Sequence, residues 1–215
     1  MSPLSWLDRL NQRYPWSHND FYGPWVVGKV AESNARTVLD IGCGTGNIVD
    51  LMRHRVDRVI GIEPDAHCAR YAAHRFAQDE AVTIQQRSFD QVNGNLRADA
   101  VVLVAVLHHL PLTSALARLR ELTNPGGRVV VIGCYRQAGP VDAAFGLISV
   151  VSNPILGFIK NHRRAGTLPS DVSAPTLEPR ESLSEIVGEV QRILPGARIR
   201  RRLFWRYCLV YDVPK

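Results

Sequence analysis

The sequence predicts an α/β fold in which helices cover both faces of a doubly wound, mostly parallel sheet. Short β-branched runs alternate along the chain with segments of helical periodicity. These runs contain little polar alternation, which is typical of parallel strands that are buried on both faces. The 215 residues, 46% hydrophobic and 21% charged, suit a single domain with an ordinary core.

Five runs are expected to form the parallel strands: TVLDIG, RVIGIE, AVTIQQRS, ADAVVLVAV and GRVVVIG. Small and apolar residues recur at helical spacing over residues 65–78, so this segment is expected to be a helix. Another helix is expected in the segment ending LARLRELTNPGG, with Thr113 as its cap and Pro125 and Gly126 as its stop.

The C-terminal part is expected to complete the sheet. RESLSEIVGEVQRIL has helical periodicity, and ARIRRRLFWRYCLVYDV is predicted to form two strands with a tight connection at residues 203–206. This antiparallel hairpin would close the edge of the sheet and bring the total to seven strands. Alternation would place Arg200 and Arg202 on one face of the hairpin and Arg201 on the other, as a solvated edge protected by charge.

Two segments fall outside the alternation. The first 35 residues carry the aromatic cluster YPWSHNDFYGPW, in which His18, Asp20 and Tyr22 lie; it would form either a lid over a site or a terminal helix docked on the core. Residues 136–179 are irregular, with an apolar part that Asn153 and Pro154 interrupt. Because that part is shorter than the roughly 20 apolar residues of a membrane span, we expect no membrane segment.

Composition excludes several classes of protein. The four cysteines have no paired spacing, so neither a zinc site nor a disulfide framework is expected; they are Cys43, Cys68, Cys134 and Cys208. The first residues do not resemble a signal peptide, which favours a cytoplasmic protein. The formal charge of +6 comes mainly from arginine, so it is weak support for a polyanionic partner.

A glycine-rich loop follows the first expected strand, in VLDIGCGTGN. A strand, a glycine-rich turn and a helix together present backbone N–H groups to a nucleotide-like ligand. The dinucleotide fingerprint requires a glycine at its sixth position, where Asn47 stands here. The loop instead places Asp40 before three glycines that alternate with other residues: Gly42, Gly44 and Gly46.

With this loop the chain resembles the class I S-adenosylmethionine-dependent methyltransferases of small-molecule type, from Thr37 to the C-terminus. The resemblance implies a Rossmann-like fold and S-adenosyl-L-methionine as cofactor. It also implies a cofactor set in which the loop binds the methionine part, Glu63 binds the ribose hydroxyls, Asp90 accepts from the adenine amino group, and Ser88 and Phe89 flank the ring. The full set is Asp40, Gly42, Cys43, Gly44, Gly46, Glu63, Pro64, Ser88, Phe89, Asp90 and Val104.

Other interpretations of these residues stay open. Glu63 could cap the following helix, because carboxylates are favourable near helix N-termini. Asp90 could be an ordinary turn residue. Cys43 is expected to fill space in the loop rather than to act as a nucleophile, because the sequence indicates no base beside it.

The resemblance divides one domain, residues 1–215, into four parts: an N-terminal lid segment (1–35), a cofactor-binding core (36–135), an acceptor-site cap insertion (136–180), and a C-terminal helix with its hairpin (181–215). Methyl transfer from a sulfonium is an in-line displacement, so positioning supplies much of the catalysis. His108 and His109 follow the fourth strand and are the candidate catalytic bases. Adjacent side chains diverge at a strand end, so at most one should face the acceptor, and both could be structural. No metal is expected.

The acceptor is expected to be a small, partly apolar molecule that is methylated on oxygen or nitrogen. Nucleic acid is the alternative, supported by the net charge and by KNHRR at residues 160–164. It is less favoured because AVLHHLP stands where base-methylating relatives carry Asn or Asp, Pro, Pro and an aromatic residue. A non-catalytic cofactor-binding module or an oxidoreductase is a third possibility. The sequence leaves the oligomeric state open.

Overall fold

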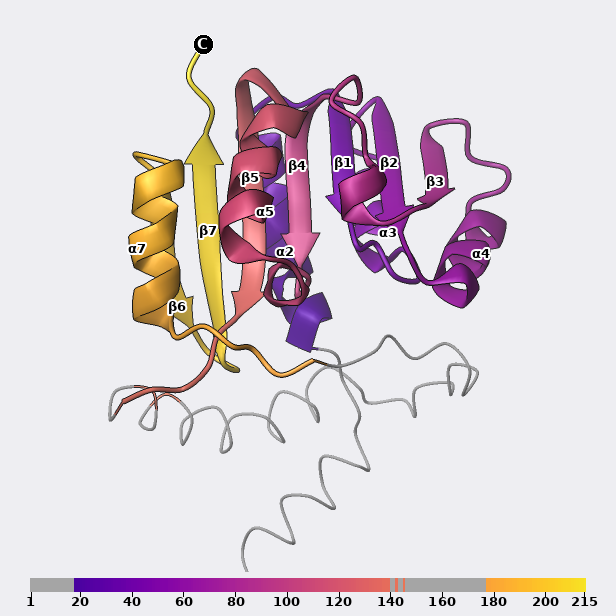
Figure 1. The fold of residues 1–215 in the computed structure, drawn as a ribbon. Coiled ribbons are helices and arrows are strands. Elements are labelled where there is room, and N and C mark those ends of the chain that lie inside the picture. Colours follow the sequence, from indigo (N-terminus) through magenta and orange to yellow (C-terminus); the bar gives the residue numbers. More distant parts are fainter. Residues whose placement is uncertain (1–17, 140–141, 143–144, 146–176) are drawn as a thin grey trace, which may run out of the picture.

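The computed structural model describes residues 18–139, 142, 145 and 177–215, and its centre is a seven-stranded sheet (Figure 1). The strand order is β3-β2-β1-β4-β5-β7-β6. In chain order the strands are β1 Thr37–Ile41, β2 Arg58–Glu63, β3 Val82–Gln86, β4 Ala98–Val104, β5 Thr123–Cys134, β6 Arg198–Arg202 and β7 Arg206–Asp212. The first five are parallel, while β7 is antiparallel to both β5 and β6, which confirms the expected mixed sheet.

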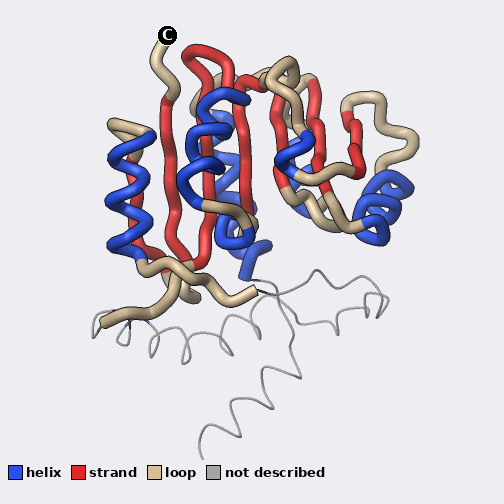
Figure 2. Tube along the Cα trace, viewed as in Figure 1, coloured by secondary structure: helices blue, strands red, loops and turns tan. Residues whose placement is uncertain are grey.

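Helices cover both faces of the sheet (Figure 2). On one face, α2 (His18–Ala31) and α3 (Asn47–Met52) pack on alternate residues of the strands, including Val38 and Val102. On the other face, α5 (Leu112–Leu122) and α7 (Leu183–Ile193) pack on the intervening residues, including Leu39 and Leu103. The central strands are therefore buried on both sides, which is why their sequences are apolar throughout.

Two helix boundaries differ from the expectation. The helix α4 (Ala66–Arg75) begins after Asp65, whose side chain accepts the N–H groups of His67 and Cys68, and it ends before residue 78. The expected Thr113 cap of α5 was wrong: Pro111 occupies the cap position, and the Thr113 hydroxyl bonds to the carboxylate of Glu189 on α7. The Thr113 hydroxyl does not cap α5 because it forms a hydrogen bond with α7 instead.

The end of α5 also differs. The helix ends at Leu122, and the next residue already belongs to β5, so the expected stop at Pro125 and Gly126 was wrong. Thr123 pairs with Ala98 of β4, and its hydroxyl donates to the carbonyl of Leu119 at 2.7 Å. Sheet pairing therefore ends this helix before the proline is reached.

The helix α2 docks on the core through its apolar side chains. Val26, Val27 and Val30 are buried against the sheet, and the hydroxyl of Tyr22 donates to the carbonyl of Leu203 at 2.9 Å. Burial raises the pKa of Tyr22 to about 12. Of the two interpretations of the aromatic cluster, docking therefore holds for the described part; residues 1–17 of the expected lid segment lie outside the described residues.

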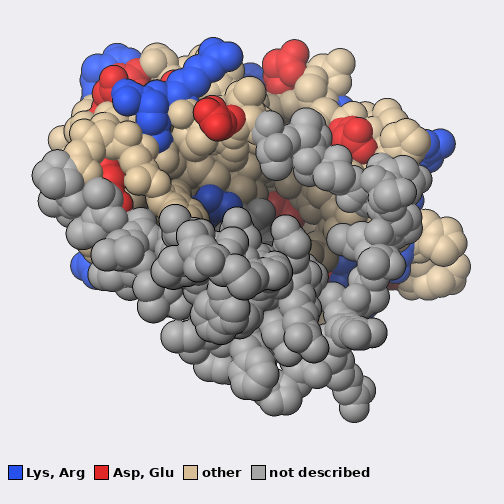
Figure 3. All heavy atoms as spheres, turned by 90° about the horizontal axis from the view of Figure 1, so that it is seen from below, with Lys and Arg blue, Asp and Glu red and all other residues tan. Residues whose placement is uncertain are grey.

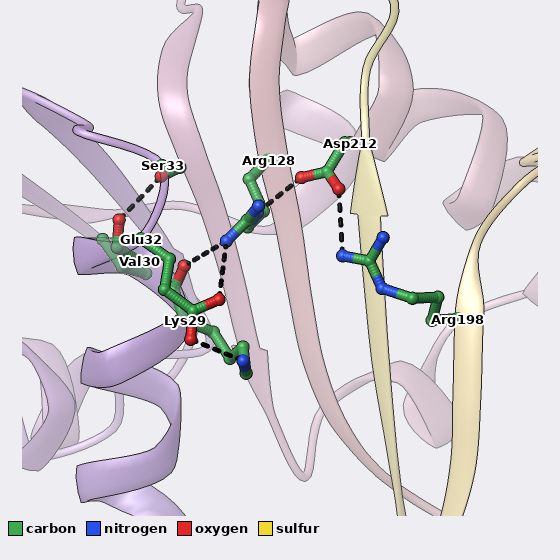
Figure 4. Close-up of polar contacts among 7 residues, drawn as sticks. All are labelled: Lys29, Val30, Glu32, Ser33, Arg128, Arg198 and Asp212. Carbon is green, nitrogen blue, oxygen red and sulfur yellow. Dashed lines mark hydrogen bonds and ion pairs between the residues drawn. The ribbon is translucent and has the colours of Figure 1, made fainter.

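A polar network around Arg128 of β5 ties α2 to the last two strands (Figure 4). The Arg128 guanidinium donates to Asp212 on β7, to the carbonyl of Lys29, and to Glu32. Asp212 also accepts from Arg198 on β6 at 3.0 Å. The network lies at the end of the sheet opposite the carboxyl ends of the parallel strands.

The hairpin arginines alternate between the faces as expected, but two of them are not a solvated edge. Arg201 forms an ion pair with Asp142 at 2.9 Å, with the Asp142 side chain only 7% exposed. Arg202 lies over the ring of Trp25 on the opposite face, and both arginines are partly buried. The expectation of a solvated, charged edge was therefore wrong for Arg201 and Arg202, because helix α2 and residue 142 cover this end of the hairpin.

Most of the expected cap insertion lies outside the described residues, and so does KNHRR. Within the described parts of the chain, no helix has both the length and the apolar character that a membrane crossing requires.

Candidate active site

The carboxyl ends of β1, β2 and β4 meet at one edge of the sheet, the lower edge in Figure 1. The loops that follow these three strands carry most of the residues that the sequence singled out. Parallel strands bring their carboxyl ends together, and this is where ligands bind in open α/β sheets.

The three glycines of the first loop have positive φ angles of 70°, 54° and 87°, so all three adopt a conformation that favours glycine. A Cβ atom at Gly42 would lie 2.3 Å from Val106, and one at Gly46 would lie 2.4 Å from Phe76. A Cβ at Gly44 would meet nothing within 4 Å. Two of the glycines therefore allow close packing within the protein, while Gly44 exposes its backbone to space that a ligand can use.

Glu63 connects this loop to the end of β2. One carboxylate oxygen accepts the N–H of Gly44 at 2.8 Å, and the other accepts the N–H of Asp65 at 2.9 Å. The residue is only 8% exposed. The side chain that caps α4 is that of Asp65 and not that of Glu63, so the helix-cap interpretation of Glu63 was wrong.

Asp40 is buried beside this pair, with 1% of its surface exposed. Burial, together with the nearby Glu63 carboxylate, raises the pKa of its carboxyl group to about 7. Its Oδ2 atom is buried and has no hydrogen-bond partner in the described structure. A buried acceptor without a donor is costly, so this position fits the cationic amino end of a bound ligand.

The segment after β3 forms a short 3₁₀ turn, Phe89–Gln91. The backbone N–H of Ser88 donates to the Gln91 side chain at 3.0 Å, and Phe89 packs partly on the core. Asp90 is exposed, and a hydrogen bond from Ser88 lowers the pKa of its carboxyl group. An ionised, accessible carboxylate can accept a hydrogen bond from an adenine amino group, and Asp90 is at the same time a residue of the 3₁₀ turn.

Three other expected residues take different positions. Cys43 is buried, and its Sγ would lie 2.8 Å from a Cβ atom at Gly61; burial raises the pKa of its thiol. It therefore fills space, as expected, because a thiol of raised pKa is a poor nucleophile. Pro64 is exposed beside Glu63, and Val104 is partly buried at the end of β4.

His108 and His109 lie in a 3₁₀ turn, Leu107–His109, beyond the end of β4. Their ring centroids are 4.1 Å apart, so the expected divergence of the two side chains was wrong: a 3₁₀ turn, and not an extended strand, carries them. His109 is exposed. Burial, helped by the charges of His109 and Arg206, lowers the pKa of His108 to about 4, and its Nδ1 has no hydrogen-bond partner among the described residues.

Sequence reasoning missed two residues of this edge. Ala105 has a φ of 57°, unusual for a residue other than glycine, and its N–H donates to the carbonyl of Ile132 at 2.7 Å. This turn directs the side chain of Val106 against Gly42. Nothing in the sequence pattern could have indicated it, since the contact joins two loops that are distant along the chain. In the described part of the chain, no group of three or more metal-binding side chains is present.

Comparison with known proteins places this geometry among methyltransferases. The family described as "Methyltransferase domain" matches residues 24–147. An uncharacterised methyltransferase of Mycobacterium tuberculosis strain H37Rv is 29% identical over 201 residues, which cover 93% of this chain and 98% of the relative.

Two further matches differ in what they act on. The ribosomal RNA small subunit methyltransferase A of Acidobacterium capsulatum is 30% identical over 59% of this chain and 48% of its own. Human N-acetylserotonin methyltransferase, solved in complex with its S-adenosylmethionine cofactor, has a TM-score of 0.60 at 15% identity, covering 99% of this chain and 56% of its own. At that identity the last match shows the fold alone.

Proposed function

Because the chain belongs to the methyltransferase domain family, as a class I enzyme dependent on S-adenosyl-L-methionine, we propose that it methylates an oxygen or a nitrogen of a small, partly apolar acceptor. This proposal rests on one observation: the glycine loop that would bind the cofactor and the turn that carries two histidines lie at the same edge of the sheet. Gly44, Glu63 and Asp40 form the proposed cofactor edge. His108 and His109 follow closely after Val106, which lies against Gly42 of the same glycine loop.

We assign the cofactor contacts residue by residue. The open backbone at Gly44 and the orphaned carboxylate oxygen of Asp40 would receive the methionine part. Glu63 would receive the ribose hydroxyls, since its carboxylate lies between the glycine loop and the end of β2. Asp90 would accept from the adenine amino group, with Ser88 and Phe89 beside the ring. Gly42 and Gly46 would act indirectly, by letting Val106 and Phe76 pack against the loop.

The bound cofactor supplies an electrophilic methyl group on a sulfonium, and the protein's part is to place the acceptor in line with it. His108 is neutral at neutral pH because its pKa is about 4. A neutral imidazole can accept a hydrogen bond or a proton from the acceptor, but one with so low a pKa is a weak base. We therefore assign His108 mainly to orienting the acceptor, with the exposed His109 as the alternative proton acceptor.

RNA is the second candidate acceptor, and the named RNA-modifying relative favours it. The described part of the carboxyl-edge face carries side chains of both signs (Figure 3). A surface dedicated to phosphates would carry clustered lysine and arginine without interspersed carboxylates. We therefore favour a small-molecule acceptor over RNA.

The deciding experiment measures release of the demethylated cofactor across a panel of phenols, amines, carboxylic acids and RNA. Turnover of small molecules that depends little on salt is the expected result. Turnover of RNA alone, falling steeply as salt rises, would exclude the small-molecule proposal. We also propose a cytoplasmic location, supported by four free cysteines, because free thiols persist in reducing compartments.

A further inference from the structure

The turn between β6 and β7 lies at the same edge of the sheet as the carboxyl ends of β4 and β5 (Figure 1). This follows from the reversed direction of β7, whose first residue, Arg206, pairs with Cys134, the last residue of β5. Arg206 also pairs with Arg202, the last residue of β6. Directly paired residues share a face, so the two arginines lie side by side on the face that α2 covers.

Arg202 is a partly buried cation that has no carboxylate partner among the described residues. Its guanidinium lies 5.9 Å from the ring centroid of Trp25, and its Nε donates to the thiol of Cys208 at 3.2 Å. No carboxylate of the described residues forms an ion pair with Arg202, whereas Arg201, on the other face, is paired with Asp142. An arginine stays charged in a protein, so a partly buried one fits an anion brought by a ligand.

The turn adds a further hydrogen-bond donor. The Nε1 of Trp205 is buried and has no acceptor among the described residues. Phe204 and Trp205 both have positive φ angles, 59° and 55°, in a turn whose central positions usually hold asparagine or glycine. The ring of Phe204 is fully buried and packs on Phe21, which accounts for that residue. No such aromatic packing contact explains the positive φ of Trp205 among the described residues.

The two arginines belong to the acceptor side of the site. The Leu107–His109 turn packs against β5, and the last residue of β5 pairs with Arg206. The charge of Arg206 also helps to lower the pKa of His108. Burial raises the pKa of Tyr22 on α2, and the charges of Arg202 and Arg206 both act to lower it. Arg202, Arg206 and the turn that carries His108 therefore all lie near the carboxyl end of β5.

We propose that the acceptor carries an oxyanion, a carboxylate or a phosphate, that Arg202 and Arg206 bind beside His108. The inference rests on the proposed function, and it specifies the acceptor as an acid. A guanidinium binds such a group through two parallel hydrogen bonds, and the Trp205 indole supplies another donor. The anionic end of the acceptor would then lie on the hairpin, leaving its nucleophilic atom directed towards β4 and the cofactor.

The test is calorimetric titration of the protein loaded with S-adenosyl-L-homocysteine. The probes are benzoate and phenyl phosphate, with benzamide and benzyl alcohol as neutral counterparts. We expect the acids to bind at least tenfold more tightly than the neutral probes. Arg202→Gln and Arg206→Gln should each abolish most of that preference, and Arg202→Lys should retain part of it, because lysine keeps the charge without the planar fork.

The matched control is Arg200→Gln, an exposed arginine on the same strand, which should leave the preference unchanged. Melting temperature and cofactor affinity establish that each variant is folded. Equal binding of acids and neutral probes, or an acid preference that survives both glutamine variants, would overturn the inference. So would salt-dependent binding of a short RNA without binding of either small acid.

The comparison of benzoate with phenyl phosphate identifies which oxyanion the site prefers. Failure of the proposed function would show separately, as an absence of demethylated-cofactor release with every acceptor of the panel. The calorimetric titration with acids measures binding and not turnover, so it still tests the inference if no acceptor is methylated.

Discussion

The carboxylate of Glu63 accepts the backbone N–H of Gly44 at 2.8 Å, which joins the end of β2 to the glycine loop after β1. The residue proposed to bind the ribose thus also holds the loop proposed to bind the methionine part. A change at Glu63 should therefore affect both ends of the cofactor.

Replacing Glu63 by alanine should weaken binding of S-adenosyl-L-methionine by roughly 1.5–3 kcal/mol, the scale of losing charge-assisted bonds. Isothermal calorimetry measures the effect. Glu80→Ala, at an exposed acid on the surface, is the control and should change nothing. Unchanged affinity in a folded Glu63→Ala protein would remove this residue from the site.

Two alanine substitutions in the glycine loop should separate binding from stability. Gly44→Ala should cost about 1–2 kcal/mol of unfolding free energy, from its positive φ alone, yet abolish most cofactor binding, because the new methyl group enters ligand space. Gly46→Ala should cost more stability, since its Cβ would also overlap Phe76 at 2.4 Å. Denaturant unfolding and calorimetry on both variants check this; similar effects on both quantities would contradict it.

Asp40 should make stability depend on pH. Its folded pKa is about 7, above the ordinary value of 3.8, so the folded state holds a proton that the unfolded state releases between these values. Stability without ligand should therefore fall as pH rises from about 4 through 7. Asp40→Asn should stabilise the protein at pH 8 and much less at pH 5, while weakening cofactor binding. A stability gain that is the same at both pH values would show that this carboxyl group does not titrate as stated.

His108→Gln should lower kcat about 10²-fold while leaving cofactor affinity intact, if the imidazole takes the acceptor's proton, and by less if it only orients the acceptor. Its pKa of about 4 adds a second expectation: kcat/KM of the native enzyme should show no loss from protonation of His108 between pH 8 and pH 5.5. His109→Gln is the matched variant, and comparing its kcat with that of His108→Gln shows which of the two histidines acts on the acceptor. An inflection near pH 6.5 that disappears in His108→Gln would contradict the burial of this ring.

Asp212→Ala should destabilise the fold without touching the site. It removes one acceptor of Arg128, whose side chain is 12% exposed, and the carboxylate paired with Arg198. Because Asp212 itself is 44% exposed, we expect a loss of only about 1 kcal/mol. Asp57→Ala, which breaks the open pair with Arg36, should cost almost nothing. A change in cofactor affinity in the Asp212 variant would show that the two ends of the sheet are coupled.

The strands and the glycine loop could be predicted from the sequence, because both follow from local patterns: apolar runs, β-branched residues and glycine spacing. What could not be predicted arises from contacts between distant segments. The positive φ of Ala105 and the packing of Val106 on Gly42 depend on two loops meeting. The burial of Arg202 depends on where α2 lies, and nothing in RIRRR indicates that Trp25 will cover one arginine of the run.

The placement of β7 has a consequence for synthesis on the ribosome. The apolar residues 129–134 of β5 find their second pairing partner in residues 206–212, which are translated more than seventy positions later. Until that strand emerges, β5 presents an unpaired, hydrophobic border to the cell, the kind of surface on which nascent chains aggregate and chaperones bind. One edge of β5 therefore stays unpaired until residues 206–212 have left the ribosome, so chaperone binding to the nascent chain should be strongest in this interval.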